Sequence, residues 1–135
     1  MFVTRAGRHD KADLKDFIES VRGGEVDTSQ GTAMIAREGA IVGCIRLIEV
    51  APGTLVYDDV LIAPDTDAAV AGQLIQAAMN NKGGTIYTAA PEAEVELFAA
   101  LGFAAIEPGD EPPGVAAYWD GRSESEKDVV HLRAR

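Results

Sequence analysis

The chain has 135 residues, the usual size of one domain, so we predict a single domain over residues 1–135. A hydrophobic content of 47% and a charged content of 25% are typical of a soluble globular protein. The net charge of −10 argues against nucleic acid and anionic membrane surfaces as partners, and it favours a cationic partner such as an amine. The N-terminal residues have no apolar stretch of signal-peptide type, and the single cysteine excludes an intramolecular disulfide, so we predict a cytoplasmic protein.

The first half of the sequence predicts one strand, one helix and then a β-meander. Phe2–Arg5 is a short strand candidate, and Asp10 is a plausible N-cap for a helix that ends at Gly23-Gly24. Residues 25–31 are polar and predict a loop. Three strands then follow, separated by the turn signals Glu38-Gly39 and Pro52-Gly53, and we expect them to be antiparallel. The predicted ranges of these strands are Thr32–Arg37, Ala40–Val50 and Thr54–Ile62.

The second half predicts alternating helices and strands. A helix at about Asp67–Asn80 is expected to connect the strand at 54–62 to a parallel strand at Thr85–Ala89 by a right-handed crossover. A further helix is expected to begin at Pro91 and to end before Gly102. The remaining predicted strands are Phe103–Ile106, Val115–Trp119 and Asp128–Leu132, the last two paired around the polar loop 121–127. The predicted fold class is therefore α/β (α+β), with a mixed, mostly antiparallel twisted sheet and helices on both faces.

The segment Val56–Ile75 carries the most specific functional signal. It reads as a strand, an exit marked by a proline, a turn of small residues and an amphipathic helix. Such a junction leaves backbone N–H groups at the start of the helix where an anion can bind. The junction contains only one glycine, Gly72, and no Arg, Lys or Gln precedes the helix. We therefore expect an altered version of a phosphate-binding junction.

The order of these elements, together with the segments VYDDVLIAPD, Leu74-Ile75 and LFAALGF (97–103), resembles the GNAT superfamily of N-acetyltransferases. The resemblance implies a GNAT-like acyl-CoA N-acyltransferase fold and acetyl-CoA as co-substrate. It implies that the pantetheine arm pairs with the end of the fourth strand and that the pyrophosphate lies at the start of the next helix. The family's loop motif, Arg/Gln-x-x-Gly-x-Gly/Ala, falls on Thr66, Ala69 and Ala71, of which only Ala71 conforms. The implied cofactor-binding residues are Val60, Leu61, Ile62, Thr66, Ala69, Val70, Ala71 and Phe98.

The catalytic candidates come from the same resemblance and from the chemistry of amide formation. The reaction needs a base for the attacking amine and an acid for the departing thiolate. Asp58 occupies the fourth-strand position that often carries an acid in these enzymes, and Glu49 is a second carboxylate that we expect within reach. The family's usual helix tyrosine aligns with Phe98, so Tyr87 or Tyr118 would have to supply the proton.

Two functions remain open at this stage. The first is a small N-acetyltransferase that transfers an acetyl group from acetyl-CoA to a small-molecule or peptide amine. The second is a catalytically inactive GNAT-like regulatory or interaction module that binds CoA thioesters. A homodimer is also expected if Val129-Val130 and Trp119 lie at the end of the sheet.

Overall fold

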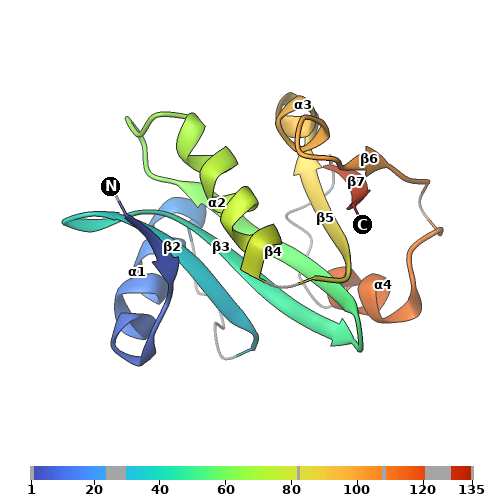
Figure 1. Ribbon diagram of the computed structural model, residues 1–135, viewed down its shortest axis with the longest axis horizontal. Helices are drawn as coiled ribbons and strands as arrows, with labels where there is room; N and C mark the ends of the chain where they lie inside the picture. The colour runs from blue at the N-terminus through green and yellow to red at the C-terminus, as the bar shows by residue number, and fades with distance from the viewer. Residues whose placement is uncertain (1, 24–29, 82, 108, 121–128, 135) are drawn as a thin grey trace. The chain divides into compact units, whose positions relative to one another are not determined.

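The structure, a computed structural model, describes residues 2–23, 30–81, 83–107, 109–120 and 129–134 (Figure 1). Its strands form one seven-stranded sheet, in the order β1-β2-β3-β4-β5-β7-β6. The strands are β1 (Phe2–Arg5), β2 (Thr32–Glu38), β3 (Ala40–Ala51), β4 (Thr54–Ile62), β5 (Thr85–Pro91), β6 (Ala104–Ala105) and β7 (Val129–Ala134). The helices are α1 (Lys11–Arg22), α2 (Ala69–Asn81), α3 (Val95–Ala99) and α4 (Pro113–Asp120), with short 3₁₀ turns η1 (Arg8–Asp10) and η2 (Glu92–Glu94).

The chain divides into two compact units, which are described in turn. Unit 1 contains Met1–Ile48 and Asp58–Lys82, and unit 2 contains Glu49–Tyr57 and Gly83–Arg135. The long strands β3 and β4 both contribute to each unit.

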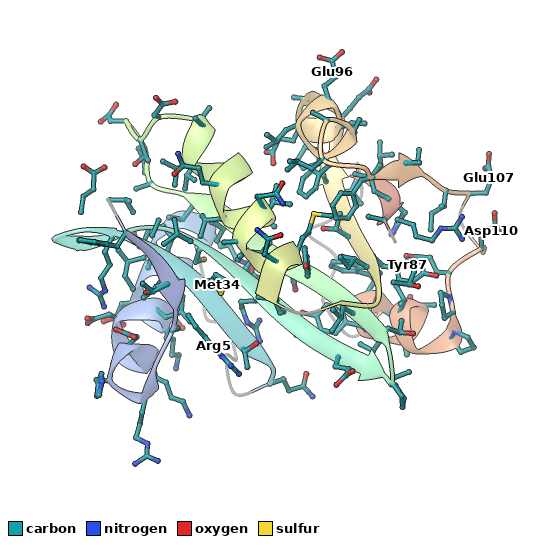
Figure 2. All side chains as sticks on the ribbon, in the orientation of Figure 1. Arg5, Met34, Tyr87, Glu96, Glu107 and Asp110 are labelled. Carbon is teal, nitrogen blue, oxygen red and sulfur yellow. The ribbon has the colours of Figure 1, made fainter. Side chains whose placement is uncertain are left out.

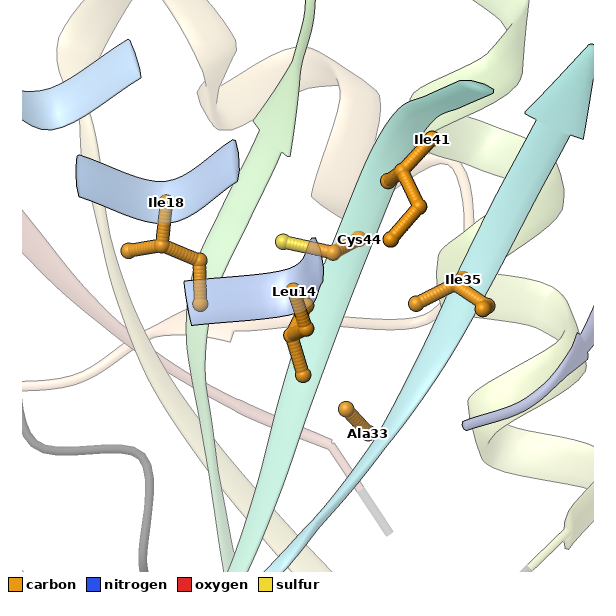
Figure 3. Close-up of a cluster of buried hydrophobic side chains, with 6 residues drawn as sticks. All are labelled: Leu14, Ile18, Ala33, Ile35, Ile41 and Cys44. Atoms are coloured by element: carbon orange, nitrogen blue, oxygen red, sulfur yellow. The ribbon is translucent and has the colours of Figure 1, made fainter. Parts of the chain in front are cut away.

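Unit 1 begins with the predicted meander. β1 pairs antiparallel with β2, and β2 pairs antiparallel with β3, with a register shift between Ala36 and Arg37. α1 covers one side of these strands, because its apolar residues Leu14 and Ile18 are buried against them. Figure 3 shows these two side chains of α1 together with Ala33, Ile35, Ile41 and Cys44 of the strands, which form one buried cluster with them.

The opposite side of the same strands is covered by α2. Gly43 precedes Cys44, so the two residues face opposite sides of β3. A Cβ atom on Gly43 would lie 2.9 Å from Leu74 Cδ1 and 3.3 Å from Val70 Cγ1, so the helix packs directly on the glycine backbone. Helices therefore cover both faces of the sheet in unit 1, as the sequence predicted.

Unit 2 is built around β5. The first residues of β4 run parallel to β5, from Thr54↔Thr85 to Tyr57↔Thr88, which confirms the predicted parallel pairing. β7 pairs antiparallel with β5, from Ile86↔Ala134 to Pro91↔Val129, and the two residues of β6 pair with β7.

The prediction of a terminal hairpin is wrong. Residues 115–119 belong to the helix α4, whose first turn is closed by N–H groups of Val115 and Ala116 donating to the Pro112 carbonyl. Pro113 is the first residue of this helix, a position where a missing N–H costs nothing. β7 consequently pairs with β5 and β6, so it is not the last strand of the sheet. The predicted loop 121–127 and Asp128 lie outside the described residues.

Three details differ from the prediction. Asp10 is the N-cap residue of α1, as predicted, but its side chain makes no capping hydrogen bond with this helix, and its Oδ2 instead accepts the N–H of Gly7 at 2.7 Å and closes the preceding turn. Pro91 ends β5, and α3 begins only at Val95 after the turn η2. The strand predicted at Phe103–Ile106 is reduced to Ala104–Ala105.

None of the helices in the described part of the chain has the length and hydropathy needed to cross a bilayer. Of the predicted loop 25–31, residues 25–29 lie outside the described residues.

Candidate functional site

In the middle of the strand β4, the backbone of Asp59 is left-handed, with a φ of 50°. Its fully buried carboxylate is held by two arginines, at 2.8 Å from Arg22 Nη1 and 3.1 Å from Arg46 Nη1. Arg46 Nη2 also donates to the Gln30 carbonyl at 3.0 Å, and the Cys44 thiol donates to the Asp59 carbonyl at 3.3 Å. A non-glycine residue in this backbone region is strained, and here charge pairing from α1 and β3 holds it in place.

Asp58, the predicted base, is directly tied to this irregularity. Its side chain is buried, and its Oδ1 accepts the Asp59 N–H at 2.7 Å. Glu49 is an exposed residue near the end of β3, and its Oε2 accepts the N–H of Gly53, in the turn before β4, at 3.3 Å. Glu49 therefore belongs to the end of β3, whereas Asp58 belongs to the middle of β4.

Beyond Tyr57 the register of β4 with β5 ends, although β4 itself continues to Ile62. The predicted pantetheine-binding residues Val60, Leu61 and Ile62 are half-buried in this last part of the strand. The chain then leaves the sheet, with the N–H of Ala63 donating to the Val42 carbonyl at 2.8 Å.

The start of α2, the predicted phosphate site, is occupied by its own capping interactions. Asp67 Oδ1 accepts the N–H of Ala69 at 2.9 Å, and the Asp67 carbonyl accepts the N–H of Val70 at 3.0 Å. The N–H of Ala71 donates to the carbonyl of Ala68 at 3.1 Å. Thr66 lies in the preceding turn, where its N–H donates to the Ala63 carbonyl. A carboxylate therefore takes the position at this helix N-terminus that an anionic ligand would use.

In unit 2, Phe98 of α3 packs edge to face on Phe103, with ring centroids 5.3 Å apart, and Phe103 lies 6.4 Å from the ring of Tyr57. The Tyr57 hydroxyl is buried and has no hydrogen-bond partner among the described residues. Burial raises the pKa of this hydroxyl to about 12. Tyr57 cannot be recognised from the sequence as unusual, because a tyrosine in a strand gives no sign that its hydroxyl lacks a partner.

Tyr87 points to the other side of the unit 2 strands. Tyr57 is in register with Thr88, and Tyr87 is its neighbour along β5, so the Tyr57 and Tyr87 side chains face opposite sides. Figure 2 marks the place of Tyr87 on the ribbon. The structure therefore does not bring Tyr87 to the face on which Tyr57 and Phe103 meet.

A second polar feature of unit 2 is a contact between His131 of β7 and Glu111 of the segment before α4. Glu111 Oε2 lies 3.0 Å from His131 Nδ1, in an orientation that is not that of a hydrogen bond. The Trp119 ring lies 6.3 Å from the His131 ring, and its buried Nε1 has no partner within residues 2–23, 30–81, 83–107, 109–120 and 129–134. Nearby in the sequence, Glu107 and Asp110 are exposed (Figure 2). This contact holds the segment in place but adds no group to the predicted site.

A scan against protein-family models found no match, and neither did a search of the curated proteins. Solved structures are similar over the full length of the chain. A GNAT-family acetyltransferase from Staphylococcus aureus superposes with a TM-score of 0.73 at 17% identity, over 98% of this chain and 97% of that one. An IAA acetyltransferase from Bacillus cereus gives a TM-score of 0.72 at 14% identity, over 98% and 97% of the two chains.

A longer protein contains the same fold as a part. N-acetylglutamate synthase from Neisseria gonorrhoeae, solved with coenzyme A and N-acetyl-glutamate, gives a TM-score of 0.69 at 19% identity. That similarity covers 100% of this chain and 35% of the synthase. At such low identities the similarity establishes the fold, which is that of the GNAT acyl-CoA N-acyltransferases, as the sequence resemblance implied.

Proposed function

We propose that the protein is an N-acetyltransferase that transfers an acetyl group from acetyl-CoA to the amine of a small molecule or peptide. The observation that carries the proposal is the end of β4: pairing with β5 stops at Tyr57, and the next two residues are the buried acids Asp58 and Asp59. This arrangement occurs in a fold shared with acetyltransferases along the full length of the chain.

The residues suit the thioester half of acetyl-CoA better than its diphosphate half. The last part of β4, Val60–Ile62, extends beyond the register with β5 and is suited to receive the amide groups of a pantetheine arm. At the start of α2, in contrast, Asp67 already accepts the Ala69 N–H, and its charge repels a diphosphate. We therefore expect weak CoA binding with the affinity carried by the pantetheine arm, and no step below depends on the diphosphate.

Bound acetyl-CoA supplies an activated acetyl thioester. Asp58 is the residue that we assign to the proton of the attacking amine, either directly or through one water molecule. Its carboxylate accepts the Asp59 N–H, and Asp59 is itself anchored by Arg22 and Arg46, so the direction of Asp58 is fixed. The net charge of −10 favours the approach of a cationic amine.

A second function, that of an inactive module that binds CoA thioesters, is favoured by two observations. The Asp67 carboxylate occupies the N-terminus of α2. Where the GNAT resemblance places a tyrosine, this chain has Phe98, whose side chain cannot donate a proton. Binding and turnover separate the two functions, because the module would bind acetyl-CoA without consuming it.

Calorimetric titration with CoA, acetyl-CoA and S-acetyl-pantetheine tests the binding. If the pantetheine arm carries the affinity, S-acetyl-pantetheine should bind within about tenfold of acetyl-CoA, a difference of about 1.4 kcal/mol. Asp67→Asn keeps a capping side chain but removes its charge, so it should tighten binding of CoA and leave that of S-acetyl-pantetheine unchanged. Thr66→Arg should tighten CoA binding by about 1–2 kcal/mol, whereas the exposed control Thr32→Arg should not.

Release of CoA thiol in the presence of a panel of amino acids, polyamines and N-terminal peptides tests the activity. Wild type should turn over at least one amine, and Asp58→Asn should reduce turnover by about 10²-fold or more. Glu49→Gln removes a carboxylate from the turn at Gly53 and should have little effect. Full activity in Asp58→Asn would contradict the assignment, and acetyl-CoA binding without turnover in wild type would favour the inactive module. Gel filtration of the same samples tests the predicted homodimer.

A further inference from the structure

The two edges of the sheet differ in what they offer to another molecule. The sheet ends at the four-residue strand β1 on one side and at β6, a strand of two residues, on the other. The homodimer expected at Val129-Val130 cannot form by adding a strand there, because β7 is an inner strand in which these residues already pair with Pro91 and Ala90. Within the described part of the chain, β1 is therefore the longer open edge.

This edge strand carries an exposed aromatic ring. Phe2 is 76% exposed, and no other large apolar side chain is exposed to this degree among the residues that the structure describes. Phe2, Thr4 and Ala6 face the same side of the sheet, because side chains alternate along a strand, and Ala6 packs against the buried cluster beneath α1. An apolar side chain on an open strand edge favours pairing with another strand.

The hydrogen bonds to β2 show which main-chain groups of β1 face the open edge. Ala6 donates its N–H to the carbonyl of Ala33 at 2.8 Å, and the two residues lie opposite each other when the register of β1 with β2 is continued. Hydrogen-bonded pairs alternate along an antiparallel ladder, so every second residue of β1 turns its N–H and C=O towards β2. The residues between them, Val3 and Arg5, turn these groups outward, where the structure describes no further strand.

We propose that β1 pairs antiparallel with β1 of a second copy, about a two-fold axis through Thr4. In this register Val3 of each copy lies opposite Arg5 of the other, and the two pairs make four main-chain hydrogen bonds. An axis through Val3 would leave only one hydrogen-bonded pair, Val3 with Val3, within the bounds of β1. The dimer does not depend on the proposed acetyltransferase function, and its test uses no CoA compound.

The side chains of β1 suit a second copy of the same strand. Thr4 lies opposite Thr4 of the other copy in a non-hydrogen-bonded pair, where two β-branched side chains contact each other favourably. Phe2 lies opposite the small Ala6, on the face where its ring is exposed. Arg5 lies opposite Val3, so no like charges are directly opposed. Four residues per copy make an interface smaller than the usual size of about 1,600 Å², so the dimer should be weak and concentration-dependent.

Sedimentation velocity at protein concentrations of about 5–500 µM tests the association. The mean mass of wild type should rise towards that of a dimer. Val3→Pro removes the outward N–H, and with it two of the four hydrogen bonds, but leaves the bonds to β2 intact. It should stay monomeric, whereas the control Val3→Ala, which keeps the N–H, should still dimerise. Circular dichroism establishes that both variants are folded.

Disulfide trapping in the folded protein tests the register. Thr4→Cys places two thiols across the axis with Cα atoms about 4.5 Å apart, which suits a disulfide. Val3→Cys places them more than about 7 Å apart, which does not. Thr4→Cys should therefore cross-link at least about tenfold faster than Val3→Cys, and the buried Cys44 should not react. Amide exchange of Val3 and Arg5 should slow as the dimer forms.

Several outcomes would overturn the inference. These are a wild type that is monomeric at every concentration, a dimer that Val3→Pro leaves intact, and Val3→Cys cross-linking as fast as Thr4→Cys. Slow amide exchange at Val3 and Arg5 in a monomer would mean that the chain covers this edge itself. A monomeric wild type that binds an extended peptide of another protein at β1 would assign the edge to a different partner.

Discussion

Replacing Asp59 by asparagine should destabilise the protein strongly, although it removes only a charge. Asparagine keeps the size of the side chain and tolerates the left-handed backbone at this residue, so the effect of charge is isolated. Arg46, with 6% of its side chain exposed, would lose its buried anionic partner, a change that costs about 3–5 kcal/mol. Arg22 is 23% exposed, and solvent would compensate most of its loss. We therefore expect a loss of about 3–5 kcal/mol, which is a large part of a typical domain stability of about 5–15 kcal/mol.

Urea unfolding followed by circular dichroism measures this loss, and thermal unfolding should show a decrease of about 10–20 °C in Tm. Lys15→Met, which removes an exposed ion pair 3.9 Å from Glu19, is the control and should change stability by less than about 0.5 kcal/mol. The double variant Asp59→Asn/Arg46→Met should recover part of the loss, because it leaves no unpaired charge on Arg46. If Asp59→Asn stays within about 1 kcal/mol of wild type, the ion pairs do not stabilise the left-handed backbone at Asp59.

Three further results are expected. Gly43→Ala should destabilise the protein by about 1–3 kcal/mol, because the new Cβ would meet Leu74 at 2.9 Å, whereas Gly83→Ala, with nothing within 4 Å, should be tolerated; urea unfolding compares the two. Burial raises the pKa of the Cys44 thiol, so a disulfide reagent at pH 8 should label it only on unfolding, and fast labelling of the native protein would contradict its burial. The hydrogen bond from the Gly7 N–H and the contact with Arg37 lower the pKa of Asp10 below its ordinary value of 3.8. The stabilisation from Asp10 is therefore present above pH 3.8 and lost as the pH falls through the lowered pKa, and the stability difference between wild type and Asp10→Asn should disappear in acid.

Much of the fold follows from local signals in the sequence. The turn residues Glu38-Gly39 and Pro52-Gly53 separate β-rich runs, and the bounds of β4 agree with the prediction, Thr54–Ile62. The helix between β4 and β5 was also predictable, because its apolar stripe has helical spacing, and a connection of this length favours parallel strands.

The remaining features depend on tertiary contacts that local patterns do not encode. Val115–Trp119 is apolar enough for a strand, but Pro113 begins a helix there. The left-handed backbone of Asp59 depends on Arg22 and Arg46, which are distant from it in sequence. The same holds for the Tyr57 hydroxyl, whose lack of a partner is a property of the packed rings of Phe98 and Phe103.

The strand order of unit 2 has a consequence for how the chain folds. β7 lies between β5 and β6, although both precede it in the sequence, and within the described part of the chain β6 is an edge strand that pairs with β7. The meander of unit 1 joins strands that are neighbours in sequence, so its loop-closure entropy is small and it can form early. β5, in contrast, exposes one edge of hydrogen-bonding groups until residues 129–134 arrive to cover it. Until that step a partly folded chain carries an open strand edge that can pair with another chain, so this protein is most prone to aggregation late in folding.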